Sequence, residues 1–253
     1  MSLAALDGLW WVLAFLIPFL LVQRWLHREL QAVFLLLTRR PEIALGLFSL
    51  LFFPGVLLHE ASHYVAARLL RVPTGGISLL PQVLPDGRLR LGYVETARAD
   101  PLREALIGTA PLLTGGAVIA FLGIQYLGFV PLAAQAAQGD WDGLWAGLQA
   151  LPQLPDFWVW FYLAFAVSST MMPSSSDRQA WLPVLLGVAV LLAVALLVGA
   201  GPWMLAQLGP RVNQALRAVS MVFGTGLVVH TLLVLPIGLF RRFLNRVTGL
   251  RVV

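Results

Sequence analysis

The chain contains no cysteine and no lysine, and it has few charged residues of either sign. Without cysteine it can form no disulfide and no thiolate metal site, so any bound metal must be held by His, Asp or Glu. Charged residues make up 11% of the 253 residues, against about 25% in a typical soluble domain, and hydrophobic residues make up 59%. This composition predicts an integral membrane protein surrounded by lipid bilayer.

All 17 basic residues are arginine, and the formal net charge is +5. A positive balance is also found in proteins that bind nucleic acid. Here the arginines cluster between apolar segments, which is where membrane topology places them. We therefore expect no nucleic-acid partner.

Apolar segments of membrane-spanning length recur along the chain, and we predict about six transmembrane helices. The predicted spans are residues 8–22, 42–70, 101–127, 156–172, 179–205 and 213–240. Residues 24–40 carry four arginines around an apolar stripe and predict a separate interfacial helix. The expected fold class is an all-α polytopic membrane protein with one domain over residues 1–253.

Between the second and third spans the pattern changes to that of a β-hairpin. Residues 88–95 alternate between polar and apolar, and they follow the turn signal Pro85-Asp86-Gly87. We predict a hairpin over residues 76–95, with Pro81 on an edge strand. Asp100 and Pro101 then predict the start of the next helix.

Six spans place both ends of the chain on one side of the membrane, together with the hairpin and the 173–178 segment. By this count eleven arginines lie on that side and six on the other. The excess of arginine predicts that this side is the cytoplasm. We expect the cell membrane of a prokaryote, with both termini cytoplasmic.

The sequence His59-Glu60-Ala61-Ser62-His63 lies inside the second predicted span. Histidines four residues apart share one face of a helix and can bind one zinc ion, with Glu60 beside it to accept a proton from water. Ionisable groups inside an apolar span are costly and are usually functional. The motif therefore predicts a Zn²⁺ site within the membrane.

A catalytic zinc site needs a third protein ligand and an open position. Asp177 follows the fourth span, in the proline- and serine-rich segment 173–178, on the same side as the end of the second span. It is the preferred third ligand, and Glu95 and Glu104 are the alternatives.

Several of these features together resemble the site-2 protease family of intramembrane zinc metallopeptidases. They are the HExxH motif in the second span, the hairpin, Gly108-Thr109-Ala110-Pro111, and Pro173 four residues before Asp177. The resemblance covers about residues 42–180, the core of that family. It implies that His59, His63 and Asp177 bind zinc and that Glu60 activates water.

The chain also departs from the pattern of that family. The family usually has an asparagine ahead of its aspartate, and this chain has Thr170 at that spacing, with Ser169 beside it. These two residues are the candidates for the polar group that holds the substrate. We expect a minimal, divergent member that lacks PDZ and CBS domains.

The expected activity is that of an intramembrane endopeptidase. Its partner would be a single-span membrane protein or a peptide substrate, and the sequence leaves a homo-oligomer open. An unwound substrate could add as a strand to the hairpin, which places Leu91 and Tyr93 in contact with it. The alternative for the hairpin is a plug in the core or a position on the membrane surface.

Two other functions are open from the sequence. One is a membrane peptidase of the other HExxH class, with a glutamate as third ligand. The other is a metal-binding membrane protein without turnover, either a transporter or a pseudoprotease. The presence of Glu60 argues against a pseudoprotease, because binding alone needs only the ligands. His230, in the sixth span, is expected to form a hydrogen bond between helices.

Overall fold

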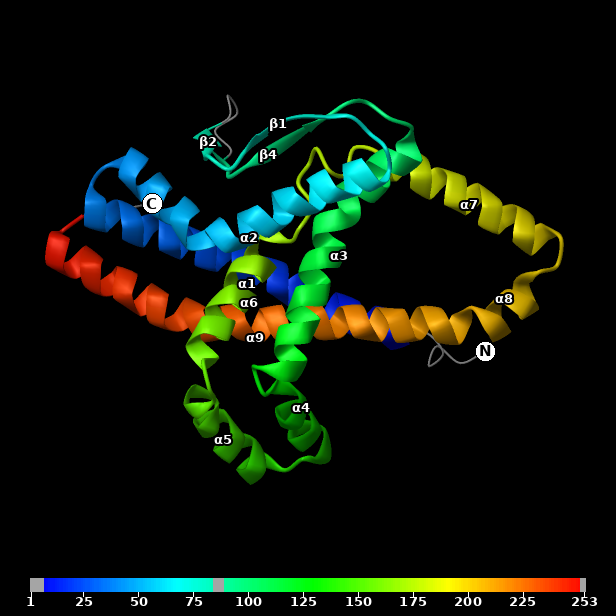
Figure 1. Cartoon of the computed structure of the whole chain (residues 1–253). Coiled ribbons are helices and arrows are strands. Elements are labelled where there is room, and N and C mark those ends of the chain that lie inside the picture. The colour runs from blue at the N-terminus through cyan, green and yellow to red at the C-terminus, as the bar shows by residue number, and fades with distance from the viewer. Residues whose placement is uncertain (1–6, 84–88, 251–253) are drawn as a thin grey trace.

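The computed structural model describes residues 7–83 and 89–250, which form mostly helices with a small antiparallel segment over one face (Figure 1). The helices are α1 (Asp7–Thr38), α2 (Pro41–Leu69), α3 (Pro101–Gln125), α4 (Phe129–Gln138), α5 (Trp141–Ala150), α6 (Phe157–Thr170), α7 (Trp181–Leu197), α8 (Gly201–Gln207) and α9 (Gly209–Thr248), with a 3-10 turn at Leu151–Gln153. The strands are β1 (Thr74–Ser78), β2 (Gln82–Val83), β3 (Leu89–Arg90) and β4 (Tyr93–Thr96).

Four of the described helices, α1, α2, α3 and α9, are long and apolar enough to cross a membrane. Helices α7 and α8 would together make a fifth, although they are bent by 114° at the break between them. Helix α6 is apolar but has 14 residues, or about 21 Å, against a hydrocarbon core of about 30 Å. These helices are compatible with an integral membrane protein, whereas the count of six spans stays a prediction.

The first helix differs from the expectation of a short span followed by a separate interfacial helix over 24–40. Helix α1 continues without a break to Thr38. Arg24 and Arg28 are exposed, and Glu29 on the packed face forms an ion pair with Arg241, 2.8 Å apart. The two arginines therefore lie outside the packed face, and Glu29 is paired with an opposite charge. None of these charged side chains requires the helix to end.

Helices α1 and α9 lie side by side and run in the same direction along most of the length of α1 (Figure 1). Asp7, at the start of α1, accepts hydrogen bonds from Asn213 and Arg217 near the start of α9. The Glu29–Arg241 pair lies 22 residues further along α1, or about 33 Å. The two ion pairs are thus separated by about the thickness of a hydrocarbon core.

This arrangement bears on the topology expected from the sequence. The first and last described segments lie at opposite ends of the α1–α9 pair, and Figure 1 shows the N and C labels far apart. If both helices cross the membrane, a parallel pair places its first residues on one side and its last residues on the other, which favours an odd number of crossings over the predicted even number. The orientation of the termini stays a prediction.

The segment between α2 and α3 forms two short antiparallel ladders. Strand β1 pairs with β4, with Ser78 opposite Tyr93, and β2 pairs with β3, with Gln82 opposite Arg90. Pro81 lies between β1 and β2, where the ladder is interrupted, and not within a strand. The predicted turn at Pro85-Asp86-Gly87 lies outside the described residues. The two ladders lie over α2 (Figure 1).

The core forms where α1, α2, α3, α6 and α9 meet, and glycines set its closest contacts. A Cβ atom at Gly55 of α2 would overlap the carbonyl oxygen of Ala166 on α6. A Cβ atom at Gly115 of α3 would lie 2.6 Å from Cβ of Met171, just after α6. Small residues at such crossings are typical of membrane helices. They hold the end of α6 close to both α2 and α3.

Candidate metal centre

Both histidines of the HExxH motif lie in the second half of α2, one turn apart on the face that packs against α3 and α6. Pro54 lies before them within α2, which is continuous from Pro41 to Leu69. The Tyr162 hydroxyl on α6 donates to the Leu51 carbonyl oxygen at 3.0 Å in this region. Helix α2 therefore presents His59 and His63 from a supported helical backbone.

Each imidazole is oriented by a backbone carbonyl of a different helix. His59 Nδ1 lies 2.7 Å from the carbonyl oxygen of Thr170, at the end of α6. His63 Nδ1 lies 2.9 Å from the carbonyl oxygen of Ile107, on α3. A carbonyl oxygen can only accept, so both Nδ1 atoms carry the proton. In the neutral rings both Nε2 atoms therefore present lone pairs, which is the form that binds metal.

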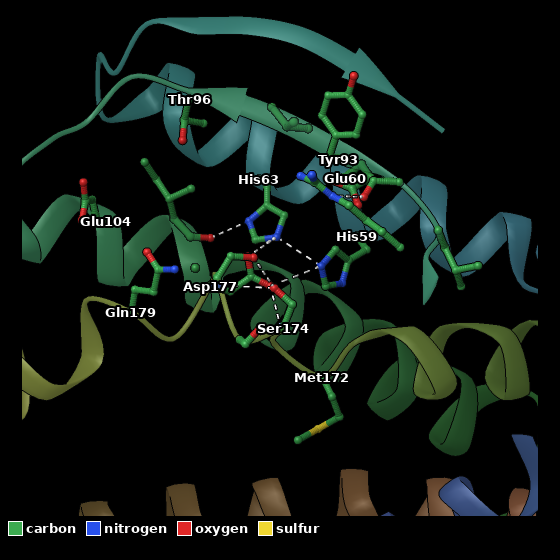
Figure 2. Close-up of a pocket in the computed structure, with 18 of the residues that line it drawn as sticks. His59, Glu60, His63, Tyr93, Thr96, Glu104, Met172, Ser174, Asp177 and Gln179 are labelled. Atoms are coloured by element: carbon green, nitrogen blue, oxygen red, sulfur yellow. Dashed lines mark hydrogen bonds and ion pairs between the residues drawn. The ribbon is translucent and has the colours of Figure 1, made fainter. Parts of the chain in front are cut away.

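These two Nε2 atoms face each other and the carboxylate of Asp177 (Figure 2). They lie 3.1 Å apart. Asp177 Oδ1 lies 3.4 Å from His63 Nε2, and Asp177 Oδ2 lies 3.7 Å from His59 Nε2. Two lone pairs and a negative charge thus converge on one point. Such an arrangement needs a positive charge there, either an additional ring proton or a cation.

The position of Asp177 is set by the segment between α6 and α7. The Ser174 backbone N–H donates to Asp177 Oδ2 at 2.6 Å, and the Asp177 backbone N–H donates to Ser174 Oγ at 3.3 Å. Burial raises the pKa of the Asp177 carboxyl. Hydrogen bonds from His59 and His63, which require a proton on Nε2, and from the Ser174 backbone N–H outweigh this and hold that pKa well below its usual range. Asp177 is therefore a carboxylate at neutral pH.

Glu60 is buried beside the two histidines, under the segment that contains β1 to β4, called the strand segment below. Gly92, just before β4, packs against it so closely that a Cβ atom there would lie 3.0 Å from Glu60 Cγ and 3.1 Å from Glu60 Oε1. Figure 2 shows Glu60 next to His59, on the side of Tyr93. The carboxylate thus lies between the α2 backbone and the strands.

The eight residues predicted to bind metal, catalyse or contact substrate line one cavity of about 1050 Å³. They are His59, Glu60, His63, Leu91, Tyr93, Ser169, Thr170 and Asp177. They come from α2, the strand segment, α6 and the segment after α6, which are far apart in the sequence. The cavity is large enough for an extended peptide segment, since ordinary ligand sites have volumes of about 300–1,000 Å³.

The hydroxyl groups of the two predicted substrate-holding residues have partners within the protein. Thr170 Oγ1 donates to the Ala166 carbonyl oxygen of its own helix at 3.0 Å. Ser169 Oγ lies 3.0 Å from Nε2 of His230 on α9, so His230 forms the hydrogen bond between helices that was expected. A direct role for either hydroxyl in holding a substrate stays a prediction.

The alternative third ligands have other positions. Glu104 lines the cavity, but its Oε1 accepts from the Ala99 backbone N–H at 3.0 Å, near the start of α3. Glu95 Oε2 accepts from the Gly76 backbone N–H at 3.2 Å. Among the described residues, the His, Asp and Glu side chains that converge as a metal-sized group are His59, His63 and Asp177. The geometry therefore favours Asp177 over both glutamates.

The donor set fits a zinc ion. Zinc–nitrogen bonds of 2.0–2.1 Å in a tetrahedral site place two ligand nitrogens about 3.3 Å apart, close to the 3.1 Å between the Nε2 atoms. Two neutral imidazoles with one carboxylate are typical catalytic zinc ligands, and they leave a fourth position open. Backbone carbonyls that fix both Nδ1 atoms are the outer contacts such ligands usually have.

Sequence reasoning missed several groups that build this site. Gly92 had a signal, because a glycine inside a strand pattern often marks a close backbone approach. Gln23 had one as well, as a polar residue within an apolar helix. The carbonyls of Ile107 and Thr170 had none, because every residue carries the same carbonyl group.

Comparison with models of known protein families, with curated proteins and with solved structures finds no match to this chain. Inferences about its function therefore depend on the geometry of the site.

Proposed function

We propose that this chain is a zinc-dependent intramembrane endopeptidase, which hydrolyses a peptide bond in or near a transmembrane segment of another membrane protein. The observation that carries the proposal is the convergence of two imidazole Nε2 atoms and one carboxylate beside a buried glutamate, in a cavity large enough for an extended peptide. The proposal agrees with the resemblance to the site-2 protease family in the motifs of residues 42–180.

His59, His63 and Asp177 would hold the zinc ion, and the carbonyls of Thr170 and Ile107 keep both rings in the binding tautomer. Zinc bound there would polarise the scissile carbonyl and make water more acidic. Glu60 would accept a proton from the attacking water at a carboxylate oxygen and later give it to the leaving amine. A glutamate with this task needs no place among the ligands, and Glu60 is outside the group that they form.

Strand β4 supports a role for the strand segment in presenting the substrate. Residues 90–98, which include β4, contribute to the lining of the cavity, whereas β1 does not. The edge of β4 that faces away from β1 is therefore the one available to an extended peptide. A transmembrane substrate must lose helical hydrogen bonds before cleavage, and addition as a strand would replace some of them.

The proposed partners are a single-span membrane protein as substrate and the surrounding lipid, in the cell membrane of a prokaryote. The rival function is metal binding without turnover. It shares His59, His63 and Asp177 and differs in giving Glu60 no chemical task. A substitution at Glu60 therefore separates the two functions.

The test combines metal analysis with cleavage assays on the purified full-length protein. We expect one zinc per chain in the wild type and in Glu60→Gln, and loss of zinc in His59→Ala and His63→Ala. His27→Leu is the matched control, since His27 lies among Phe48 and Phe52 and its Nε2 has no hydrogen-bond partner. We expect it to retain zinc.

For cleavage, the probe is a set of reporter proteins in which single apolar segments of about 20 residues join two soluble tags. The wild type should cleave some of them, and zinc-loaded Glu60→Gln should cleave none. Equal cleavage by both would remove Glu60 from the mechanism. Full zinc content in a folded His59→Ala, His63→Ala double variant would refute the metal centre.

A further inference from the structure

The C-terminal turn of α6 is held by side chains from the two outer helices, α1 and α9. Gln23 Nε2, on α1, donates to the Ser169 carbonyl oxygen at 2.7 Å. On the other side, Ser169 Oγ lies 3.0 Å from Nε2 of His230, on α9. One residue of α6 is thus bonded through both its backbone and its side chain. Both outer helices lie outside residues 42–180, the part that holds the sequence motifs.

The direction of these hydrogen bonds follows from the partners. His230 Nδ1 lies 2.8 Å from the Gly226 carbonyl oxygen, which can only accept. His230 therefore carries its proton on Nδ1 and accepts at Nε2, so the Ser169 hydroxyl donates to it. Each group has a complementary partner, and the network needs no added proton.

The three side chains are also among the most buried polar groups of the described chain. Gln23 and Ser169 are each 7% exposed, and His230 is 0% exposed. Polar groups in an apolar interior are unfavourable unless they are hydrogen-bonded, and satisfied networks fix the geometry of the segments they join. This network therefore restrains the place where α6 ends.

The end of α6 is also where His59 receives its orientation. Helix α6 ends at Thr170, so no later helical turn donates to the carbonyls of Ser169 and Thr170. The first accepts from Gln23 and the second from His59 Nδ1. The two carbonyls are neighbours in the chain. Loss of the hydrogen bonds that fix Ser169 would therefore move the Thr170 carbonyl. His63 is independent of this turn, because its Nδ1 donates to α3.

We propose that Gln23, Ser169 and His230 are positioning residues, which hold the Thr170 carbonyl and through it the imidazole of His59. The inference rests on the proposed metal centre, because the purpose of the orientation is to aim His59 Nε2 at the metal. It assigns to α1 and α9 a part in building the site, without any contact to substrate.

The first test reads the tautomer of each histidine directly. The chain has four histidines, so full-length protein labelled with ¹⁵N in histidine gives few ring signals. The metal-free protein is measured at about pH 8.5, roughly two units above the ordinary histidine pKa. In the wild type we expect His59 and His63 both to carry the proton on Nδ1. In Ser169→Ala and in Gln23→Met, His59 should become a mixture of tautomers while His63 stays unchanged.

Ser168→Ala is the matched control. Ser168 is the neighbouring serine, it is fully buried, and its hydroxyl donates to the Ala164 carbonyl oxygen of its own helix at 2.6 Å. We expect it to leave both histidines unchanged. On α9, His230→Gln keeps an acceptor near the Nε2 position and should retain the wild-type His59 signal better than His230→Leu.

The second readout is zinc affinity, measured by competition with a chelator. Loss of such outer contacts typically weakens metal binding about 10- to 100-fold, so Ser169→Ala should fall in that range and Ser168→Ala should stay within about twofold. An unchanged His59 tautomer and unchanged zinc affinity in Ser169→Ala would overturn the proposal, as would equal changes at His59 and His63. If the wild type bound no zinc, the proposed function would fail, and the tautomer measurement would still decide whether this network positions His59.

Discussion

The backbone carbonyl of Asp177 lies directly against the Cα atom of Gly108 on α3, with no room for a side chain between them. Gly108 is helical and needs no unusual backbone conformation. Its lack of a side chain instead lets the segment after α6 approach α3. The neighbouring Ile107 carbonyl holds His63, so one turn of α3 places both a histidine and the carboxylate.

We predict that Gly108→Ala weakens zinc binding by about 10- to 100-fold, the range seen when the support of a ligand is disturbed. The added methyl group would push the Asp177 segment away from the two histidines. Gly116→Ala is the matched control on the same helix, because a Cβ atom there meets Val222 Cγ1 at 3.8 Å, an ordinary contact. Zinc affinities from chelator competition should differ between the two variants. Equal affinities would show that the contact does not position Asp177.

The identity of the third ligand gives a second prediction. Asp177→Ala should lose zinc by more than the roughly 100-fold expected for an outer contact, because it removes a ligand atom itself. Glu104→Gln should keep zinc, since glutamine can still accept the hydrogen bond from Ala99. Metal content after dialysis measures both. Zinc retained in the first variant and lost in the second would reverse the assignment and favour the class with a glutamate ligand.

The strand segment gives a third prediction. The Ala97 backbone N–H donates to the Pro73 carbonyl oxygen, toward β1. Bonding directions alternate along a strand, so the N–H groups of Val94 and Thr96 should face away from β1. Proline at either position would remove one such donor. Cleavage should slow by about 3- to 10-fold, corresponding to roughly 0.5–1.5 kcal/mol for one hydrogen bond.

The control for this experiment is Ile77→Pro on β1, the strand that does not line the cavity. Ile77 lies opposite Val94, so its N–H should face the other, outer edge. Zinc content should be unchanged in all three variants. If the β4 variants cleave at the wild-type rate while folded and loaded with zinc, this edge does not bind substrate.

The fourth prediction concerns topology. Because Asp7 is next to Arg217 and Glu29 is next to Arg241, reporters fused before Asp7 and after Leu250 should lie on opposite sides of the membrane. A reporter inserted at Ser175 should score with the N-terminal one. Paired reporters, each active on one side only, measure this. Both ends on the same side would contradict the parallel α1–α9 pair as a membrane-crossing unit.

Sequence patterns were most informative where spacing alone determines geometry. Histidines four residues apart on one helix must share a face, and the apolar setting of His59 by itself indicates a functional site. The position of Asp177 after an apolar segment placed it at the correct end of the neighbouring helix. Asp100 followed the same local logic, and its side chain accepts from the Arg103 backbone N–H at 3.1 Å, as a helix cap does.

Sequence patterns were least informative where the structure depends on contacts between residues that are far apart in the sequence. The arginines at positions 24, 28, 39 and 40 predicted a separate interfacial helix, but α1 is continuous to Thr38, and its buried Glu29 pairs with Arg241, more than two hundred residues later. The topology depends on the placement of α9 as well: Arg217 lies beside Asp7, where α1 begins, whereas Arg241 lies beside Glu29, toward the end of α1. Hydrogen-bond partners such as Gln23 and the Ser169 carbonyl are likewise fixed only once α1 and α6 are packed together.

A metal ion held by α2 and by the segment after α6 would join two parts of the chain that are more than a hundred residues apart in sequence. In a chain without cysteine, it would do what a disulfide does elsewhere, restricting the unfolded state as well as holding the folded one. Zinc would then be a structural tie as well as a reagent. Removal of the metal should loosen the junction between α6 and α7 first, which would expose the Ser174–Arg178 segment to proteases while the α1–α9 pair stays folded.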